Sequence, residues 1–232
     1  MLVIGLTGGI ACGKSTVSER LEKSYHIPII DADKVAREIV EPHRDAYNRV
    51  VHYFRDKVPD LILEDGSLNR PALGKHVFAN HSDLKVLNGI THPAVRFEIL
   101  RQILISYVKG KKMCVLDVPL LFESGLDKFC GITVTVVCKK ETQIERIRSR
   151  NPQISIEEAE NRIKAQMTQE ERTQRADYVL ENDSTPVLLY GRVQSLIGKI
   201  KPSWIRTILE YFPPFAFVSG LAVVMIKHLR SM

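Results

Sequence analysis

The sequence lacks the features that mark several large classes of protein. Its four cysteines are scattered along 232 residues without a C-x-x-C pair, so neither a zinc site nor a disulfide framework is indicated. The first apolar run is only as long as a strand and passes directly into a glycine-rich loop, which argues against a secretory signal. Internal repeats and low-complexity tracts are also missing. We therefore expect a mature folded domain in a reducing, intracellular compartment.

The composition excludes a disordered chain and says less about partners. Hydrophobic residues make up 44% of the chain, which is enough to fill the core of one α/β domain with a smaller insertion. The formal net charge of +6 suits an anionic ligand or an acidic membrane surface. Because the basic residues form no stripe of the kind that binds nucleic acid, we expect no DNA or RNA partner.

A phosphate-binding loop stands near the start of the chain. The pattern of glycine, four residues and then Gly-Lys-Ser spans residues 8–15, between the apolar run 2–6 and a predicted helix. Glycines let backbone N–H groups point at phosphate oxygens, Lys14 adds a cation, and the Ser15 hydroxyl suits Mg²⁺. The residues predicted to bind ATP are Gly8, Gly9, Ile10, Ala11, Cys12, Gly13, Lys14, Ser15 and Thr16.

Two further apolar runs, 27–30 and 113–116, end in acidic residues. In an open parallel sheet the carboxyl ends of the strands line the ligand crevice. Asp33 is therefore our candidate for the general base that accepts a proton from an attacking hydroxyl. The alternative is that Asp33 merely caps the helix that follows. Asp117 has the layout of a Walker B carboxylate, which holds the hydration shell of Mg²⁺.

Residues 45–107 read as mostly helix, and their length exceeds that of one crossover helix. They predict a helical insertion that recognises the phosphate acceptor. Arg70 and His92 each precede a proline at a predicted helix start, where they are candidates for contacting an anionic acceptor. The alternative for both is an ordinary turn or cap position.

Residues 142–176 are dense in charge of both signs, which usually indicates a solvated face. The same segment falls where P-loop kinases carry a mobile lid, whose arginines neutralise the transferring phosphoryl group. Arg150, beside the predicted helix break at Asn151-Pro152, is the first candidate for that role, and Arg146 is the second. Further strands are predicted at 132–137 and 178–180, and a closing helix at 186–200.

In this order, the motifs resemble those of dephospho-coenzyme A kinases over about residues 1–200. A P-loop alone is shared by many families, whereas the ordered combination is much more specific. The residues that carry the resemblance are 5–10 with Gly13-Lys14-Ser15, Asp31-Ala32-Asp33 with Ala36-Arg37, Asp65-Gly66 with Leu68 and Arg70, His92-Pro93, 119–123, Arg162-Ile163 with Gln166, and 176–179 with Asn182.

The resemblance implies a P-loop NTPase-type parallel sheet flanked by helices, with a helical acceptor-binding part and a lid. It implies transfer of the ATP γ-phosphoryl group, with Mg²⁺, to the ribose 3′-hydroxyl of dephospho-coenzyme A, the last step of coenzyme A synthesis. Asp33 matches the presumed base of the family, and Lys14 and Ser15 match its phosphate and metal ligands. Asn182 lies in the adenine-side loop, and Pro119 in a loop that we assign to the acceptor.

Two other functions stay open at this point. One is a nucleoside or nucleoside-monophosphate kinase on the same architecture, and the other is a membrane-tethered nucleotide-binding scaffold without catalysis. Cys12 departs from the family, where small serine or glycine is commoner. A thiol near helix N–H groups can be reactive, and the alternative is an inert small residue.

The C-terminal extension, residues 201–232, differs in composition from the rest. Residues 211–226 are an uncharged run followed by basic residues. At ~1.5 Å per residue these sixteen positions reach about 24 Å, short of a ~30 Å hydrocarbon core. We hypothesise a tail anchor or interfacial helix within 204–230; the alternative is a helix packed on the core or a second subunit. It would tether the protein to an organelle membrane such as that of the mitochondrion, with the kinase domain facing the cytosol. The oligomeric state is left open.

Overall fold

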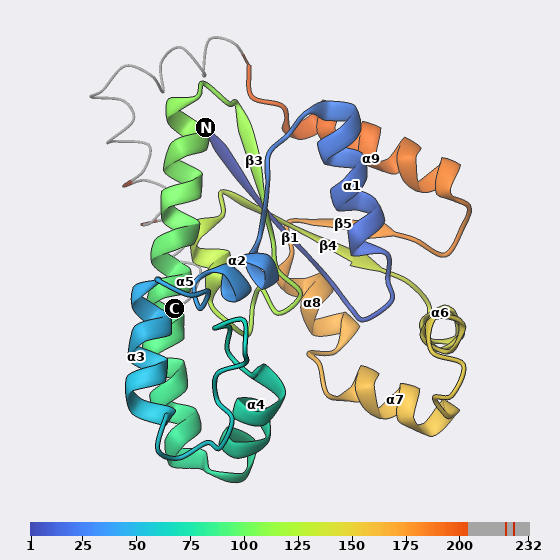
Figure 1. Cartoon of the computed structure of the whole chain (residues 1–232). Helices are drawn as coiled ribbons and strands as arrows, with labels where there is room; N and C mark the ends of the chain where they lie inside the picture. The colour runs from blue at the N-terminus through green and yellow to red at the C-terminus, as the bar shows by residue number, and fades with distance from the viewer. Residues whose placement is uncertain (204–220, 222–224, 226–232) are drawn as a thin grey trace. The chain divides into compact units, whose positions relative to one another are not determined.

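The structure, a computed structural model, describes residues 1–203 together with Leu221 and Met225 (Figure 1). It divides into two compact units. The first is formed by residues 1–30 and the described residues from 106 onward, and the second by residues 31–105.

A five-stranded parallel sheet forms the centre of the first unit (Figure 1). Its order is β2-β3-β1-β4-β5. The strands are β1 (Leu2–Gly8), β2 (Ile29–Asp31), β3 (Met113–Asp117), β4 (Ile132–Val137) and β5 (Tyr178–Glu181). Since β1 pairs with β3 on one side and β4 on the other, the strand that leads into the P-loop lies in the middle of the sheet. The parallel P-loop architecture predicted from the sequence is confirmed.

The helices of this unit differ in how they are held. Helix α1 (Lys14–Tyr25) and helix α9 (Pro186–Ile200) share one apolar cluster with the sheet, in which Leu6, Val17 and Val193 are fully buried. Burial of each such side chain stabilises the folded state by ~1.5–3 kcal/mol, so these two helices are held to the sheet by apolar packing. Between β3 and β4 lies the 3₁₀ helix η1 (Leu126–Phe129).

Three shorter helices follow β4, namely α6 (Lys140–Arg150), α7 (Ile156–Lys164) and α8 (Gln169–Arg175). Helices α7 and α8 each begin at a capping residue, whereas no side chain caps the start of α6. Ser155 caps α7 and Thr168 caps α8, each in a reciprocal pairing with a glutamate three residues on. The segment thus consists of short helices rich in charge, two of which begin with a capping box.

The second unit contains α2 (Ala32–Glu38), α3 (Asp45–Phe54), α4 (Arg70–Ala79) and most of α5 (His81–Val108). Asp83 on α5 accepts hydrogen bonds from Tyr53 and Lys57, and its other oxygen lies 2.7 Å from His76 Nε2. Lys57 first, and then His76, hold the pKa of Asp83 well below its ordinary value, at about 2. One carboxylate therefore links α3, α4 and the first turn of α5.

One predicted boundary in this unit is wrong. The sequence predicts a helix start at His92-Pro93, but both residues lie inside the 28-residue helix α5. Proline lacks an N–H, so it deprives the helix of one hydrogen bond and normally breaks or kinks it. Here the apolar face on both sides of Pro93 continues to be buried, through Ile90 and Ile99, and tertiary packing overrides the local signal.

The predicted C-terminal membrane segment lies outside the described residues. Within the part of the chain that the structure does describe, no helix combines the length and apolar character needed to cross a bilayer. The tail anchor stays a prediction.

Candidate active site

The glycine-rich loop joins the end of β1 to the start of α1. Two of its residues have left-handed backbone conformations, Ala11 with φ 59° and Gly13 with φ 91°. A short turn is closed by the Cys12 N–H, which donates to the Gly9 carbonyl at 3.1 Å. Successive N–H groups in such a curled backbone form a concave anion-binding nest at the positive end of a helix. The geometry is that of a phosphate cradle.

A lysine–carboxylate pair stands at this cradle. The Lys14 ammonium donates to Asp117 Oδ1, and the Asp117 side chain is only 7% exposed. The sheet register explains the pairing, because Asp117 is the partner of Leu6 at the carboxyl end of β3. A nucleotide bound with a divalent cation requires a lysine for its phosphates and a nearby carboxylate for the metal. Lys14 and Asp117 provide this arrangement.

The chemistry of the oxygen donors also fits Mg²⁺. Ser15 is exposed at the second position of α1, and the carboxylate of Asp117 lies beside the preceding lysine. Among the described residues no three His, Cys, Asp or Glu side chains gather into a metal cluster. Mg²⁺ is usually held by one or two protein oxygens together with substrate phosphates, so a sparse donor set of this kind suits it.

Side chains distant in sequence clamp the cradle. Asn182, which is buried after β5, donates from Nδ2 to the Cys12 carbonyl at 2.8 Å. Arg146 on α6 donates to the Ala11 carbonyl at 3.3 Å and to the Asn182 carbonyl at 3.0 Å. The sequence predicts Asn182 as an adenine-side residue and Arg146 as a lid arginine; in the structure both hold the loop backbone.

Three other residues that contact the loop were not predicted as site residues from the sequence. The Ile10 N–H donates to Gln166 Oε1 at 3.0 Å, and the Ile10 carbonyl accepts from Gln143 Nε2 at 2.8 Å. The Arg172 side chain is 3% exposed, and a Cβ placed on Gly9 would lie 3.3 Å from its Nη1. The family resemblance could have identified Gln166, because Gln166 is one of the residues that carry it. Nothing in the sequence distinguishes Arg172 from the other charged residues of its segment.

Cys12 is the one cysteine in the loop, and it is buried against another. Cys138 Sγ donates to Cys12 Sγ at 3.4 Å. This hydrogen bond lowers the pKa of the Cys12 thiol against the opposing effect of burial, while the pKa of Cys138 is raised. Each side chain is 1% exposed, so the pair fills space beneath the loop.

The remaining candidates lie on three different elements. Asp31, not Asp33, caps α2: its Oδ1 accepts from the Asp33 N–H at 2.9 Å and the Lys34 N–H at 3.1 Å. Asp33 is exposed in the first turn, so the capping alternative for its side chain is wrong. Arg70 opens α4 as predicted, and its guanidinium donates to the Arg37 carbonyl at 2.8 Å.

His92 is exposed in the middle of α5. In the first unit, the Pro119 carbonyl accepts from Thr7 Oγ1 at 2.8 Å, which ties the loop after β3 to the end of β1. The structure thus gathers Lys14, Asp117 and Arg146 at the P-loop. Asp33, Arg70 and His92 belong to the second unit.

The two candidate lid arginines should differ in their effects. Arg146→Ala removes both hydrogen bonds to the loop region, so we expect the KM for ATP to rise about tenfold or more. Arg150 is exposed at the end of α6, one turn further on, so Arg150→Ala should leave that KM within about twofold and change mainly kcat. Steady-state kinetics of the two variants side by side tests this; an equal rise in KM would contradict the assignment of Arg146 to the loop.

Comparison with known proteins gives a consistent result. A family model described as dephospho-CoA kinase matches residues 2–187. Over 231 residues the chain is 58% identical to dephospho-CoA kinase CAB5 of Saccharomyces cerevisiae, covering 100% of this chain and 96% of that protein. It is 46% identical to a dephospho-CoA kinase of Bacillus anthracis over 198 residues, 85% of this chain and 96% of the relative.

Solved structures agree. A dephospho-CoA kinase from Campylobacter jejuni matches with a TM-score of 0.67 and 29% identity, over 86% of this chain and 96% of that chain.

Proposed function

This chain belongs to the dephospho-CoA kinase family, and from that premise we propose how its residues divide the work of the reaction. The protein is a transferase that phosphorylates an alcohol group, in the last step of coenzyme A biosynthesis. The observation that carries the proposal is the P-loop cradle, with the Lys14–Asp117 pair standing at it.

ATP binds with its phosphates in the cradle formed by residues 8–16. Lys14 exchanges its contact with Asp117 for the phosphates, and Asn182 and Arg146 keep the loop backbone in its curled form. Ser15 and Asp117 would hold Mg²⁺, which, when bound, neutralises charge on the phosphates. Because phosphoryl transfer needs positioning and charge neutralisation more than covalent help, this rigid cradle supplies a large share of the catalysis.

Asp33 accepts the proton of the attacking 3′-hydroxyl. Its side chain is exposed in the first turn of α2 and is not engaged in capping, because Asp31 performs that task. Arg150, exposed at the end of α6, acts on the transferring group. Arg70, His92 and Pro119 contact the acceptor.

The experiment that tests the function is ADP release by the purified chain from ATP and Mg²⁺, with and without dephospho-CoA. Adenosine and AMP serve as competing acceptors, because they distinguish a kinase for small nucleosides or nucleotides. We expect release that depends on dephospho-CoA, and a product phosphorylated at the ribose 3′ position. Tight ATP binding without stimulation by dephospho-CoA would contradict the proposal, and preference for AMP would reassign the acceptor.

A further inference from the structure

Two cysteine thiols meet beneath the phosphate cradle. Cys12 belongs to the P-loop, and Cys138 directly follows β4. Cys138 Sγ lies 3.4 Å from Cys12 Sγ, although 126 positions separate the two residues in the sequence. The S–S bond of a disulfide is ~2.05 Å long, so a bond between these two atoms requires an approach of about 1.4 Å. The two thiols are therefore positioned to be oxidised together.

The surroundings of Cys12 favour its thiolate, which is the reactive form of a cysteine. The hydrogen bond from Cys138 lowers the pKa of Cys12 against the opposing effect of burial. The guanidinium groups of Arg172 and Arg146 lower this pKa further. The same hydrogen bond raises the pKa of Cys138, which therefore keeps its proton. Cys12 is thus the nucleophile of the pair, and Cys138 is the thiol that reacts second.

We propose that Cys12 and Cys138 form a modification site, at which a peroxide oxidises the two thiols to a disulfide and thereby weakens ATP binding. The Cys12 thiolate attacks one oxygen of hydrogen peroxide and becomes a sulfenic acid, while the other oxygen leaves as hydroxide. The Cys138 sulfur then attacks the sulfenic sulfur, forms the S–S bond and releases the first oxygen as water. In total the two thiols lose two electrons and two protons, and one hydrogen peroxide becomes two molecules of water.

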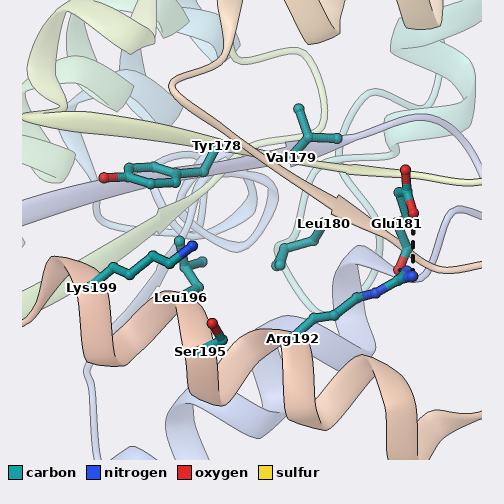
Figure 2. A pocket seen from close by; sticks show the side chains of 8 residues that line it. All are labelled: Tyr178, Val179, Leu180, Glu181, Arg192, Ser195, Leu196 and Lys199. Carbon is teal, nitrogen blue, oxygen red and sulfur yellow. Dashed lines mark hydrogen bonds and ion pairs between the residues drawn. The ribbon is translucent and has the colours of Figure 1, made fainter.

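The route of the oxidant depends on how the pair is buried. Each of the two side chains is 1% exposed and belongs to the apolar cluster that α1 and α9 share with the sheet. Leu180 and Leu196 of the same cluster line a surface pocket of about 270 Å³ between β5 and α9 (Figure 2), but neither cysteine lines it. Because this pocket does not reach the thiols, we expect hydrogen peroxide, a small neutral molecule, to arrive through local opening of the P-loop.

The backbone on both sides of Cys138 is held by hydrogen bonds to the chain after β5. On one side, the Val137 carbonyl accepts from the Asn182 N–H at 2.8 Å. On the other side, the Lys139 N–H donates to Asp183 Oδ1 at 2.6 Å. The chain around Cys138 therefore has little freedom to move toward the other sulfur.

The approach of the two sulfurs consequently displaces the P-loop. The Cys12 N–H closes the turn to the Gly9 carbonyl, and Cys12 lies between Ala11 and Gly13, which both have left-handed conformations. Drawing the Cys12 sulfur toward Cys138 pulls on this turn and turns its N–H groups away from a common centre. ATP should therefore bind the oxidised protein about tenfold more weakly, or weaker still. By linkage, bound ATP should in turn oppose the oxidation.

The test uses the full chain and requires no variant. The reduced protein is treated with hydrogen peroxide, the remaining thiols are blocked with N-ethylmaleimide, and a tryptic digest is analysed by mass spectrometry without reductant. We expect peptides joined through Cys12 and Cys138, formed about tenfold more slowly with Mg²⁺ and ATP at ten times the Kd of ATP. Calorimetry should show the higher Kd for ATP after oxidation, and dithiothreitol should restore the original Kd.

Cys114 and Cys130 are internal controls, because both are as deeply buried as the pair. Burial raises the pKa of Cys114 to about 12, and Cys130 Sγ donates to the Leu126 carbonyl at 3.6 Å. Both should keep their thiols while the pair is oxidised. Cys130 lies on the same tryptic peptide as Cys138, so fragmentation of that peptide determines which of the two is joined.

Cys138→Ala and Cys114→Ala form a matched pair of variants, each of which removes one buried thiol. Cys138→Ala should give no joined peptide and should lose the change in ATP affinity that dithiothreitol reverses. Cys114→Ala should be oxidised like the unmutated protein. Thermal unfolding before treatment checks that both variants are folded.

Two results would overturn the inference. One is treated protein without the joined peptide, or with Cys114 and Cys130 oxidised as readily as the pair, because the contact between the two sulfurs would then confer no selectivity. The other is oxidised protein that contains the joined peptide and binds ATP with an unchanged Kd. Neither measurement involves dephospho-CoA, so a failure of this inference and a failure of the proposed function are distinguishable.

Discussion

Asp33→Asn should lower kcat by about a hundredfold or more, while the KM for ATP stays within about twofold of the unmutated value. Asparagine preserves the size of the side chain and cannot accept the proton that leaves the 3′-hydroxyl. Asp33 is exposed in the first turn of α2, and its side chain does not cap the helix, so the fold should be unaffected. Steady-state kinetics with dephospho-CoA, together with nucleotide binding by calorimetry, measure the two effects separately.

Asp31→Asn is the matched control, two residues away on the same turn. Asp31 caps α2 through its Oδ1, and asparagine caps helices about as well as aspartate. This variant should therefore keep nearly all of its turnover. An Asp33→Asn enzyme that turns over at the rate of Asp31→Asn would remove Asp33 from the mechanism and leave charge neutralisation at the P-loop as the main source of catalysis.

Gly13→Ala should abolish measurable ATP binding or prevent the loop from forming. Gly13 has φ 91°, a conformation that costs a residue with a Cβ ~1–2 kcal/mol, and the added carbon would lie 2.2 Å from Asn182 Nδ2. Asn182 cannot move away without giving up its hydrogen bond to the Cys12 carbonyl. Thermal unfolding with and without ATP should show a lower Tm and no stabilisation by the nucleotide.

Gly66→Ala separates the two causes. Gly66 also has a left-handed conformation, with φ 81°, but nothing lies within 4 Å of the position that its Cβ would take. This variant should lower the Tm modestly and bind ATP normally. If Gly13→Ala bound ATP as well as Gly66→Ala does, contact between the added carbon and Asn182 would not weaken ATP binding. The double variant Gly13→Ala/Asn182→Ala would then bind ATP no better than Gly13→Ala alone.

The sheet could be predicted from the sequence because its strands are short runs of mainly apolar and β-branched residues. The predicted ranges 113–117 and 132–137 coincide with β3 and β4, and 186–200 coincides with α9. A strand buried on both faces carries few charged residues, and even the threonines of β4, Thr133 and Thr135, are buried, so such runs are a strong local signal. The predicted helix start at His92-Pro93 was wrong because proline is a local signal for a helix end or start. The packing that lets the 28-residue helix continue through Pro93 involves residues distant in the sequence, so no local signal reveals it.

The site was predicted less completely, for a different reason. The P-loop is a contiguous motif, so its residues are visible in the sequence. Gln143, Gln166 and Arg172 contact the loop from the charged segment after β4, in which the sequence does not distinguish buried from solvated polar residues. The sequence names Asp33 as the base but leaves open whether Asp33 caps α2, and only the hydrogen bonds of Asp31 show that Asp31 is the cap.

The clamp on the P-loop also bears on how the protein is made. Cys12 and Asn182 are 170 residues apart, and β1 must pair with strands that begin at Met113 and Ile132. Contacts of such long sequence separation form slowly and only after both partners have been synthesised. On the ribosome, the segment that binds ATP emerges first and waits for most of the chain to follow. A nascent chain that ends before Asn182 should therefore gain no stability from the nucleotide, and the finished enzyme acquires its ligand at the end of folding.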